Sequence, residues 1–181
     1  KYQPDDLKMI NGLLVEKVNT AKLALVKQHV QYPSKKQLFV KVQDAYKEAE
    51  KMYPFLKYQP VSLKPSVWSW VNTLVPKFLQ PFTSCHEVAH QLGYAKEMEA
   101  NFVGYLSATA SKDTLLHYSV YLDLFMYSNR NLFATDSVAA KDYRDKLAPA
   151  VIDDLKEWRA FYKKHKNPIE PVFRWIYGKY L

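Results

Sequence analysis

Two histidines and a glutamate in one short run have the residue types and spacing for metal chemistry. The run His86-Glu87-Val88-Ala89-His90 has the form HExxH, with the imidazoles four residues apart. On a helix this spacing places both rings one turn apart on the same face, so that they can bind one zinc ion. Glu87 then stands beside the first ligand, where its carboxylate can act as general base for a water molecule at the metal. The motif predicts zinc-dependent hydrolysis.

The segment after this motif offers a third ligand. Gly93 can end the helix with a left-handed turn and direct the chain back toward the metal. Glu97 then completes a His, His, Glu set, which leaves one zinc position open, as catalytic sites require. Asn101 follows Glu97 by one turn and is expected to hydrogen-bond a ligating histidine. Glu99 is the alternative ligand, although it would point to the other side of the same helix.

Several neighbouring residues have competing interpretations. Hydrolysis of a peptide needs a donor to the oxyanion, and Tyr118 is preferred for this role over Tyr121 and Tyr127. In a chain with 14 tyrosines, however, any one of them is more often a packing residue. Cys85 adjoins His86, but a helix turns successive side chains by about 100° and places the thiol in an apolar stripe. We therefore expect Cys85 to be a buried free thiol.

The pattern along the rest of the chain is mainly helical. Little period-two alternation and no internal repeat predict a mainly α fold, a helical domain around the HExxH helix with little or no β-sheet. Asp5 and Ser34 are candidate caps of the first two helices, and the prolines between Pro54 and Pro81 predict an irregular connector. The expected helices span about 5–30, 34–53, a short segment ending near Gly93, 95–110, 113–132 and 136–166, the last interrupted at Pro149.

Composition indicates one domain, residues 1–181, which folds without a disulfide because Cys85 is the single cysteine. The formal net charge is +8, but basic and acidic residues alternate, as in residues 141–146. This mixture is typical of solvated helix faces, so no nucleic-acid partner is expected. No stretch approaches the roughly 18 apolar residues that a membrane span requires, which predicts a soluble fragment.

The segment from His86 to Phe102, HEVAHQLGYAKEMEANF, resembles the signature of DUF3810, an uncharacterised family of bacterial proteins thought to be membrane-anchored zinc peptidases. The pairing of HExxH with a later Glu-x-x-Ala-Asn is also similar to gluzincin peptidases, and this resemblance implies a zincin-like fold. In gluzincins the glutamate is the third zinc ligand and the Asn or Asp position supports the site, so the resemblance implies these roles for Glu97 and Asn101. The resemblance is strongest over residues 76–127.

The same resemblance implies a setting for the chain. Members of the family typically begin with transmembrane helices, so this chain is expected to be a domain excised from a longer bacterial protein. The full-length protein would be membrane-associated, with the extracytoplasmic side favoured, and would act on a peptide or protein substrate. Gluzincins hold peptides on an edge strand upstream of the zinc helix, and residues 61–73 show no clear strand of that kind.

These observations lead to a main hypothesis and two alternatives. The main hypothesis is a zinc metallopeptidase, an endopeptidase, with Zn²⁺ as cofactor. The first alternative is a zinc-binding sensor or scaffold domain without turnover, against which the intact Glu87 argues. The second is a basic helical interaction module in which the HExxH run is accidental.

Overall fold

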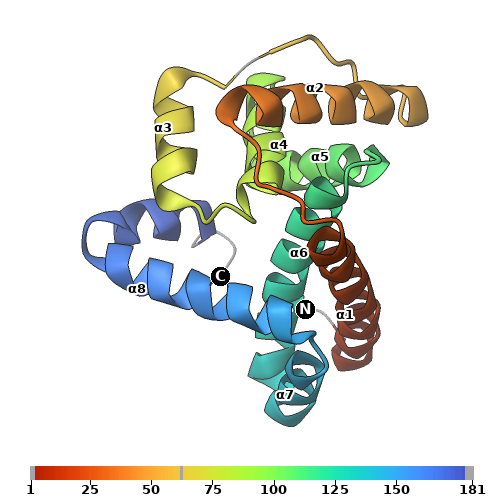
Figure 1. Ribbon diagram of the computed structural model, residues 1–181, viewed down its shortest axis with the longest axis vertical. Helices are drawn as coiled ribbons and strands as arrows, with labels where there is room; N and C mark the ends of the chain where they lie inside the picture. The colour runs from red at the N-terminus through yellow and green to blue at the C-terminus, as the bar shows by residue number, and fades with distance from the viewer. Residues whose placement is uncertain (1–2, 62, 178–181) are drawn as a thin grey trace.

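The computed structural model describes residues 3–61 and 63–177, with side chains described as far as Lys164. Within those ranges the chain forms eight α-helices and no strand, which confirms the mainly α fold. The helices are α1 (Pro4–Lys27), α2 (Lys35–Met52), α3 (Pro65–Leu74), α4 (Gln80–Gln91), α5 (Glu97–Ala110), α6 (Thr114–Thr135), α7 (Ser137–Asp145) and α8 (Pro149–Tyr177). In Figure 1, α2 to α5 gather at one end, α7 lies at the opposite end and α6 runs between them.

Helix α2 forms where local signals and packing agree. The Ser34 side chain accepts a hydrogen bond from the Gln37 backbone, and the Gln37 side chain accepts one from the Ser34 backbone. This capping box satisfies donors that the first turn would otherwise leave without partners. Its buried face consists of Leu38, Val42, Ala45, Tyr46 and Ala49. The helix ends at Met52 with Tyr53 as its C-cap, as the following proline predicts.

Helix α1 starts two residues earlier than a cap at Asp5 predicts. Gln3 is the N-cap and Pro4 opens the first turn, so the predicted cap at Asp5 is wrong. Proline has the helical φ angle built in and lacks an N–H that the first turn cannot satisfy. Asp5 and Asp6 instead lie inside the first turn, where negative charge is favourable near the positive end of the helix dipole.

Prolines set the boundaries of two further helices. The connector between Pro54 and Pro81 is irregular at both ends, as predicted, and contains the short helix α3, which begins at Pro65 and buries Val71. The predicted interruption at Pro149 is also present, because α7 ends at Asp145 and α8 begins at Pro149. The ribbon of α8 bends sharply toward its C-terminal end (Figure 1).

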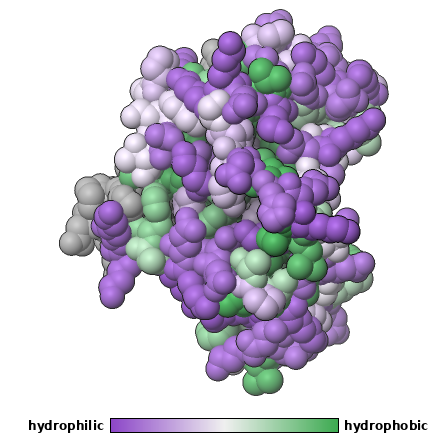
Figure 2. All heavy atoms as spheres, in the orientation of Figure 1, coloured by the Kyte–Doolittle hydropathy of each residue, from purple (hydrophilic) through white to green (hydrophobic). Residues whose placement is uncertain are grey.

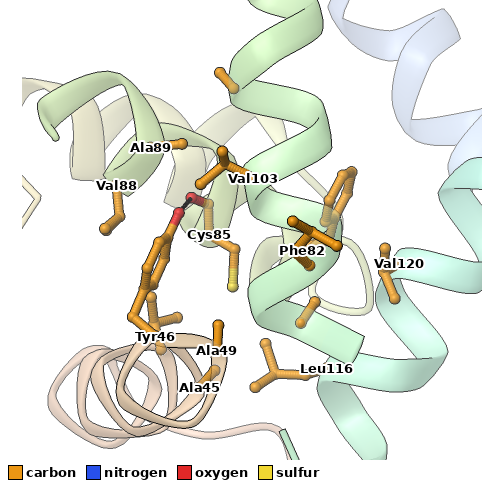
Figure 3. Packing of buried hydrophobic residues seen from close by; sticks show 14 of the residues in the cluster. Ala45, Tyr46, Ala49, Phe82, Cys85, Val88, Ala89, Val103, Leu116 and Val120 are labelled. Carbon is orange, nitrogen blue, oxygen red and sulfur yellow. Dashed lines mark hydrogen bonds between the residues drawn. The ribbon is translucent and has the colours of Figure 1, made fainter. Parts of the chain in front are cut away.

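The buried apolar residues form two large clusters that share helix α6. The first cluster joins α2, α4, α5 and the start of α6, and Figure 3 shows Tyr46 of α2 reaching toward Cys85 of α4. The second cluster joins α1, α6 and α8, with Val75, Phe78 and Leu79 from the segment before α4. Tyr121 and Leu124 of α6 pack against both clusters. Helix α6 therefore connects the two clusters.

Hydrophilic side chains cover most of the face shown in Figure 2, and apolar residues appear there in small scattered groups. Large apolar side chains are nevertheless exposed on several helices, among them Leu13 of α1, Met98 and Phe102 of α5, and Val138 of α7. Among the residues that the structure describes, no helix combines the length and apolar character needed to cross a membrane.

Candidate metal centre

Helix α4 carries the HExxH run and ends in a turn that depends on Gly93. Gly93 has a φ of 103°, in the left-handed region that glycine adopts without a steric cost. The Gly93 N–H donates to the His90 carbonyl at 3.1 Å, and the Tyr94 N–H donates to the Ala89 carbonyl at 3.2 Å. These two bonds form a Schellman motif, and the prediction that Gly93 ends this helix is confirmed. The turn brings the chain back alongside α4.

Helix α5 approaches α4 closely because Gly104 has no side chain. A methyl group at Gly104 would lie 3.1 Å from the His86 backbone nitrogen and 3.2 Å from its Cα. Glu97 and Asn101 precede Gly104 by seven and three residues, so all three lie on one face of α5. The face that touches His86 therefore also presents Glu97 and Asn101 toward α4.

The three predicted ligands come together at this contact. The two histidine Nε2 atoms lie 3.1 Å apart. Glu97 Oε2 lies 3.3 Å from His86 Nε2, and Glu97 Oε1 lies 3.4 Å from His90 Nε2. In a tetrahedral site with zinc bonds of about 2.0–2.1 Å, neighbouring ligand atoms lie about 3.3–3.4 Å apart. The spacing of these donor atoms therefore fits one zinc ion.

Hydrogen bonding also orients the cluster for a cation. His90 Nδ1 lies 2.8 Å from the Tyr94 carbonyl oxygen, so Nδ1 carries the proton and donates it. His90 Nε2 then faces the Glu97 carboxylate, and a proton or a cation between these two groups stabilises their close approach. Glu97 Oε2 is buried and has no hydrogen-bond partner. A metal ion ligated by these atoms would satisfy them together.

His86 is the most enclosed of the three ligands. Burial, reinforced by the neighbouring His90, lowers the pKa of His86 to about 4, so its imidazole is neutral at pH 7, as a ligand must be. The Asn101 side chain acts in the opposite direction by hydrogen bonding to the His86 side chain. The structure thus brings Asn101 to the ligand that it was expected to support.

Glu87 borders the cluster and opens onto a cleft of about 440 Å³. Burial raises the pKa of Glu87, and the Glu97 charge adds to this while His90 opposes it. A carboxylate with a raised pKa is a better proton acceptor near neutral pH. The cleft is lined by Val61, Lys64, Val67, Glu87, His90 and Gln91.

Comparison with known proteins places the chain in a family. Residues 69–181, more than half of the chain, match the family model described as protein of unknown function DUF3810. The chain belongs to the DUF3810 family. No curated protein and no solved structure matches the chain, so the likeness of the fold to zincins stays a prediction.

Tyr118, predicted as the oxyanion donor in this DUF3810 chain, lies in the second apolar cluster and is fully buried. Its hydroxyl donates to the Asp154 carboxylate of α8, and Lys22 Nζ lies 2.6 Å from the same carboxylate oxygen. These contacts engage the hydroxyl in a buried network of α1, α6 and α8. They give no support to a catalytic role, which remains a prediction.

Cys85 is a free buried thiol, as expected from its place on the apolar stripe of α4. Burial raises its pKa to about 12. Its backbone carbonyl accepts a hydrogen bond from the Tyr46 hydroxyl at 2.6 Å, drawn as a dashed line in Figure 3. Cys85 thus holds α4 against α2 and takes no part in the ligand cluster of this DUF3810 chain.

Three features of the site were missed in the sequence. The Tyr94 carbonyl that orients His90 is a backbone group, so the residue types in the sequence do not predict it. Lys64 and Gln91 line the cleft from different parts of the chain, and no pattern in the sequence predicts that they lie near each other. Gly104 did leave a signal, because glycine inside a helix costs stability and often marks a close contact.

Proposed function

We propose that this DUF3810 chain is a zinc-dependent metallopeptidase that hydrolyses peptide bonds internal to a chain. The observation that carries the proposal is the convergence of one ligand atom each from His86, His90 and Glu97, all within 4.8 Å of one another. Their identities and spacing suit zinc, and three protein ligands leave a position for a reacting molecule. The adjoining cleft, with Glu87 in its wall, supports turnover over storage or sensing.

Zinc held by these residues would supply Lewis-acid chemistry, polarising a carbonyl and making water more acidic. Glu87 accepts a proton from the water molecule that attacks the scissile carbonyl carbon. As the carbon–nitrogen bond breaks, Glu87 returns that proton to the leaving amine. His90 keeps its ring fixed by donating to the Tyr94 carbonyl, so its lone pair stays directed at the cluster.

The resemblance to membrane-anchored proteins supports a further part of the proposal. We infer that the full-length protein is attached to a bacterial membrane by segments outside these 181 residues, with this domain on the extracytoplasmic side. Fractionation of cells that express the full-length protein, followed by protease treatment of intact spheroplasts, tests both attachment and sidedness.

The test of the catalytic proposal is Glu87→Gln, compared with the parent chain after loading both with zinc. Removing the base should lower cleavage of a peptide library by about 100-fold or more while zinc stoichiometry stays unchanged. Glu99→Gln is the matched control, because Glu99 has a side chain that is 49% exposed and pairs with Lys96. Equal cleavage by Glu87→Gln and the control would exclude this mechanism. Stoichiometric zinc without cleavage by the parent would favour the sensor or scaffold function.

A further inference from the structure

The cleft beside the ligand cluster has a distinct chemical character. Val61 and Val67 provide apolar side chains, Lys64 provides a cation, and Gln91 provides an amide. Its volume of about 440 Å³ lies within the range of sites that hold small ligands or a few residues of a peptide. Among the six lining residues, Glu87 is the only acidic one, and the proposed mechanism already uses it.

Lys64 brings a positive charge to the cleft. It is exposed and stands at the N-cap position of α3. Several other lysines pair with acidic side chains, including Lys8 with Asp136 and Lys41 with Asp113. Within the described ranges, Lys64 forms no ion pair, so its ammonium group can attract an anionic occupant of the cleft.

Gln91 supplies a second donor. It follows Glu87 by four residues, so both side chains lie on one face of α4, and both line the cleft. The Gln91 Nε2 group is buried and has no hydrogen-bond partner. A buried donor without an acceptor costs free energy, and an acceptor oxygen brought by a ligand would recover it.

We propose that this cleft binds a carboxylate group of the substrate peptide, with Lys64 and Gln91 as its donors and Val61 and Val67 against its aliphatic part. Charge complementarity favours this occupant, because an ammonium and an amide together suit a carboxylate and the apolar walls suit the methylenes that carry it. The carboxylate can be a glutamate or aspartate side chain or the C-terminus of the peptide. The inference rests on the proposed peptidase function and specifies its substrate class.

The experiment uses peptides of one sequence that carry Glu, Gln or Lys near the scissile bond, each made with a free and an amidated C-terminus. For the zinc-loaded parent, we expect kcat/KM to favour Glu over Gln by about fivefold, as for an exposed ion pair, and the preference to shrink at high salt. If the free and amidated ends differ instead, the terminal carboxylate is the group recognised. Equal rates across both series would overturn the inference while leaving the peptidase proposal intact.

Lys64→Glu tests the source of the preference. This variant should prefer the Lys peptide, whereas Lys141→Glu on α7 should keep the parental preference. Lys141 gives the same change in net charge on an exposed face and lies at the other end of the molecule from α3 (Figure 1). Gln91→Met should weaken the preference by about threefold through loss of one hydrogen bond. Identical preferences in the Lys64 and Lys141 variants would contradict the assignment.

A binding measurement separates this inference from the catalytic proposal. Titration of Glu87→Gln protein with the Glu and Gln peptides should give about fivefold tighter binding of the Glu peptide, and Lys64→Glu in that background should abolish the difference. Carboxylate-selective binding without cleavage by the parent would support the cleft assignment and count against the peptidase function. If neither binding nor cleavage distinguished the Glu peptide from the Gln peptide, the cleft assignment would be wrong.

Discussion

Glu97 and Glu99 stand two residues apart in the first turn of α5 and face different surroundings. Glu97 has both carboxylate oxygens directed at the histidine Nε2 atoms, and its side chain is 18% exposed. Glu99 is 49% exposed and lies 3.6 Å from the ammonium of Lys96. The two residues therefore provide a matched pair, because the same substitution removes a candidate ligand at one position and a surface charge at the other.

Glu97→Gln should weaken zinc binding by more than about 100-fold, because loss of a direct ligand costs more than the 10- to 100-fold typical of its supporting residues. Glu99→Gln should leave the affinity unchanged. Competition with a chromophoric chelator measures both affinities, and circular dichroism checks that both variants keep their helices. Equal affinity in the two variants would show that Glu97 is not a ligand.

The ligand set could be predicted from the sequence because its geometry is mostly local. His86 and His90 share one helix, and Glu97 follows after a single tight turn that Gly93 specifies. The oxyanion donor could not be predicted in this way. Choosing Tyr118 from 14 tyrosines required knowledge of which helices meet, and its hydroxyl is engaged by Asp154, far along the chain.

At the scale of elements, the site depends on how closely α5 lies against α4. Both helices contribute ligands, so their separation sets the distance between the histidines and Glu97. At Gly104 a methyl group would lie 3.1 Å from the His86 backbone nitrogen, so close that the backbone of α4 would have to shift. Gly12 on α1 is also inside a helix, but a methyl group there would make an ordinary contact, 3.7 Å from the Tyr143 ring.

Gly104→Ala should therefore destabilise the protein by about 1–3 kcal/mol through overpacking and should also weaken zinc binding. Gly12→Ala should stabilise it by about 0.5–1 kcal/mol, because alanine loses less backbone entropy in a helix and meets no clash. Chemical denaturation gives both free energies, and metal titration gives both affinities. If Gly104→Ala were as stable as Gly12→Ala and bound zinc normally, the close approach would not govern the site.

Helix positions were predictable where the apolar period and the boundary residues agree, as for α2 with Ser34 and Tyr53. The buried face of α1 was harder to predict from the sequence. Leu23 and Val26 recur at helical spacing yet are 56% and 52% exposed, whereas Lys22 is buried. A polar residue enters a core only when a distant partner satisfies it, and sequence periodicity does not reveal such partners.

At the scale of the whole molecule, the buried polar network of Lys22, Tyr118 and Asp154 joins three helices. Lys22 from α1 lies 2.6 Å from the Asp154 carboxylate of α8, and its ammonium lies 5.0 Å from the centre of the Tyr118 ring of α6. All three residues are at least nine-tenths buried. Partners at such sequence separation and burial hold α8 and α1 against α6, because removing one leaves a buried group unsatisfied.

Tyr118→Phe separates this structural role from the catalytic role first expected. Loss of a hydrogen bond to a charged acceptor should lower the free energy of unfolding by about 1.5–3 kcal/mol, with zinc affinity and peptide cleavage unchanged. Tyr121→Phe on the same helix removes a half-buried hydroxyl and should change stability by less than about 0.5 kcal/mol. If Tyr118 instead donates to the oxyanion, kcat should fall by about 100- to 1,000-fold. Denaturation and cleavage rates of both variants decide between the two roles. A purely structural hydrogen bond to Asp154 predicts a loss of stability with no change in cleavage.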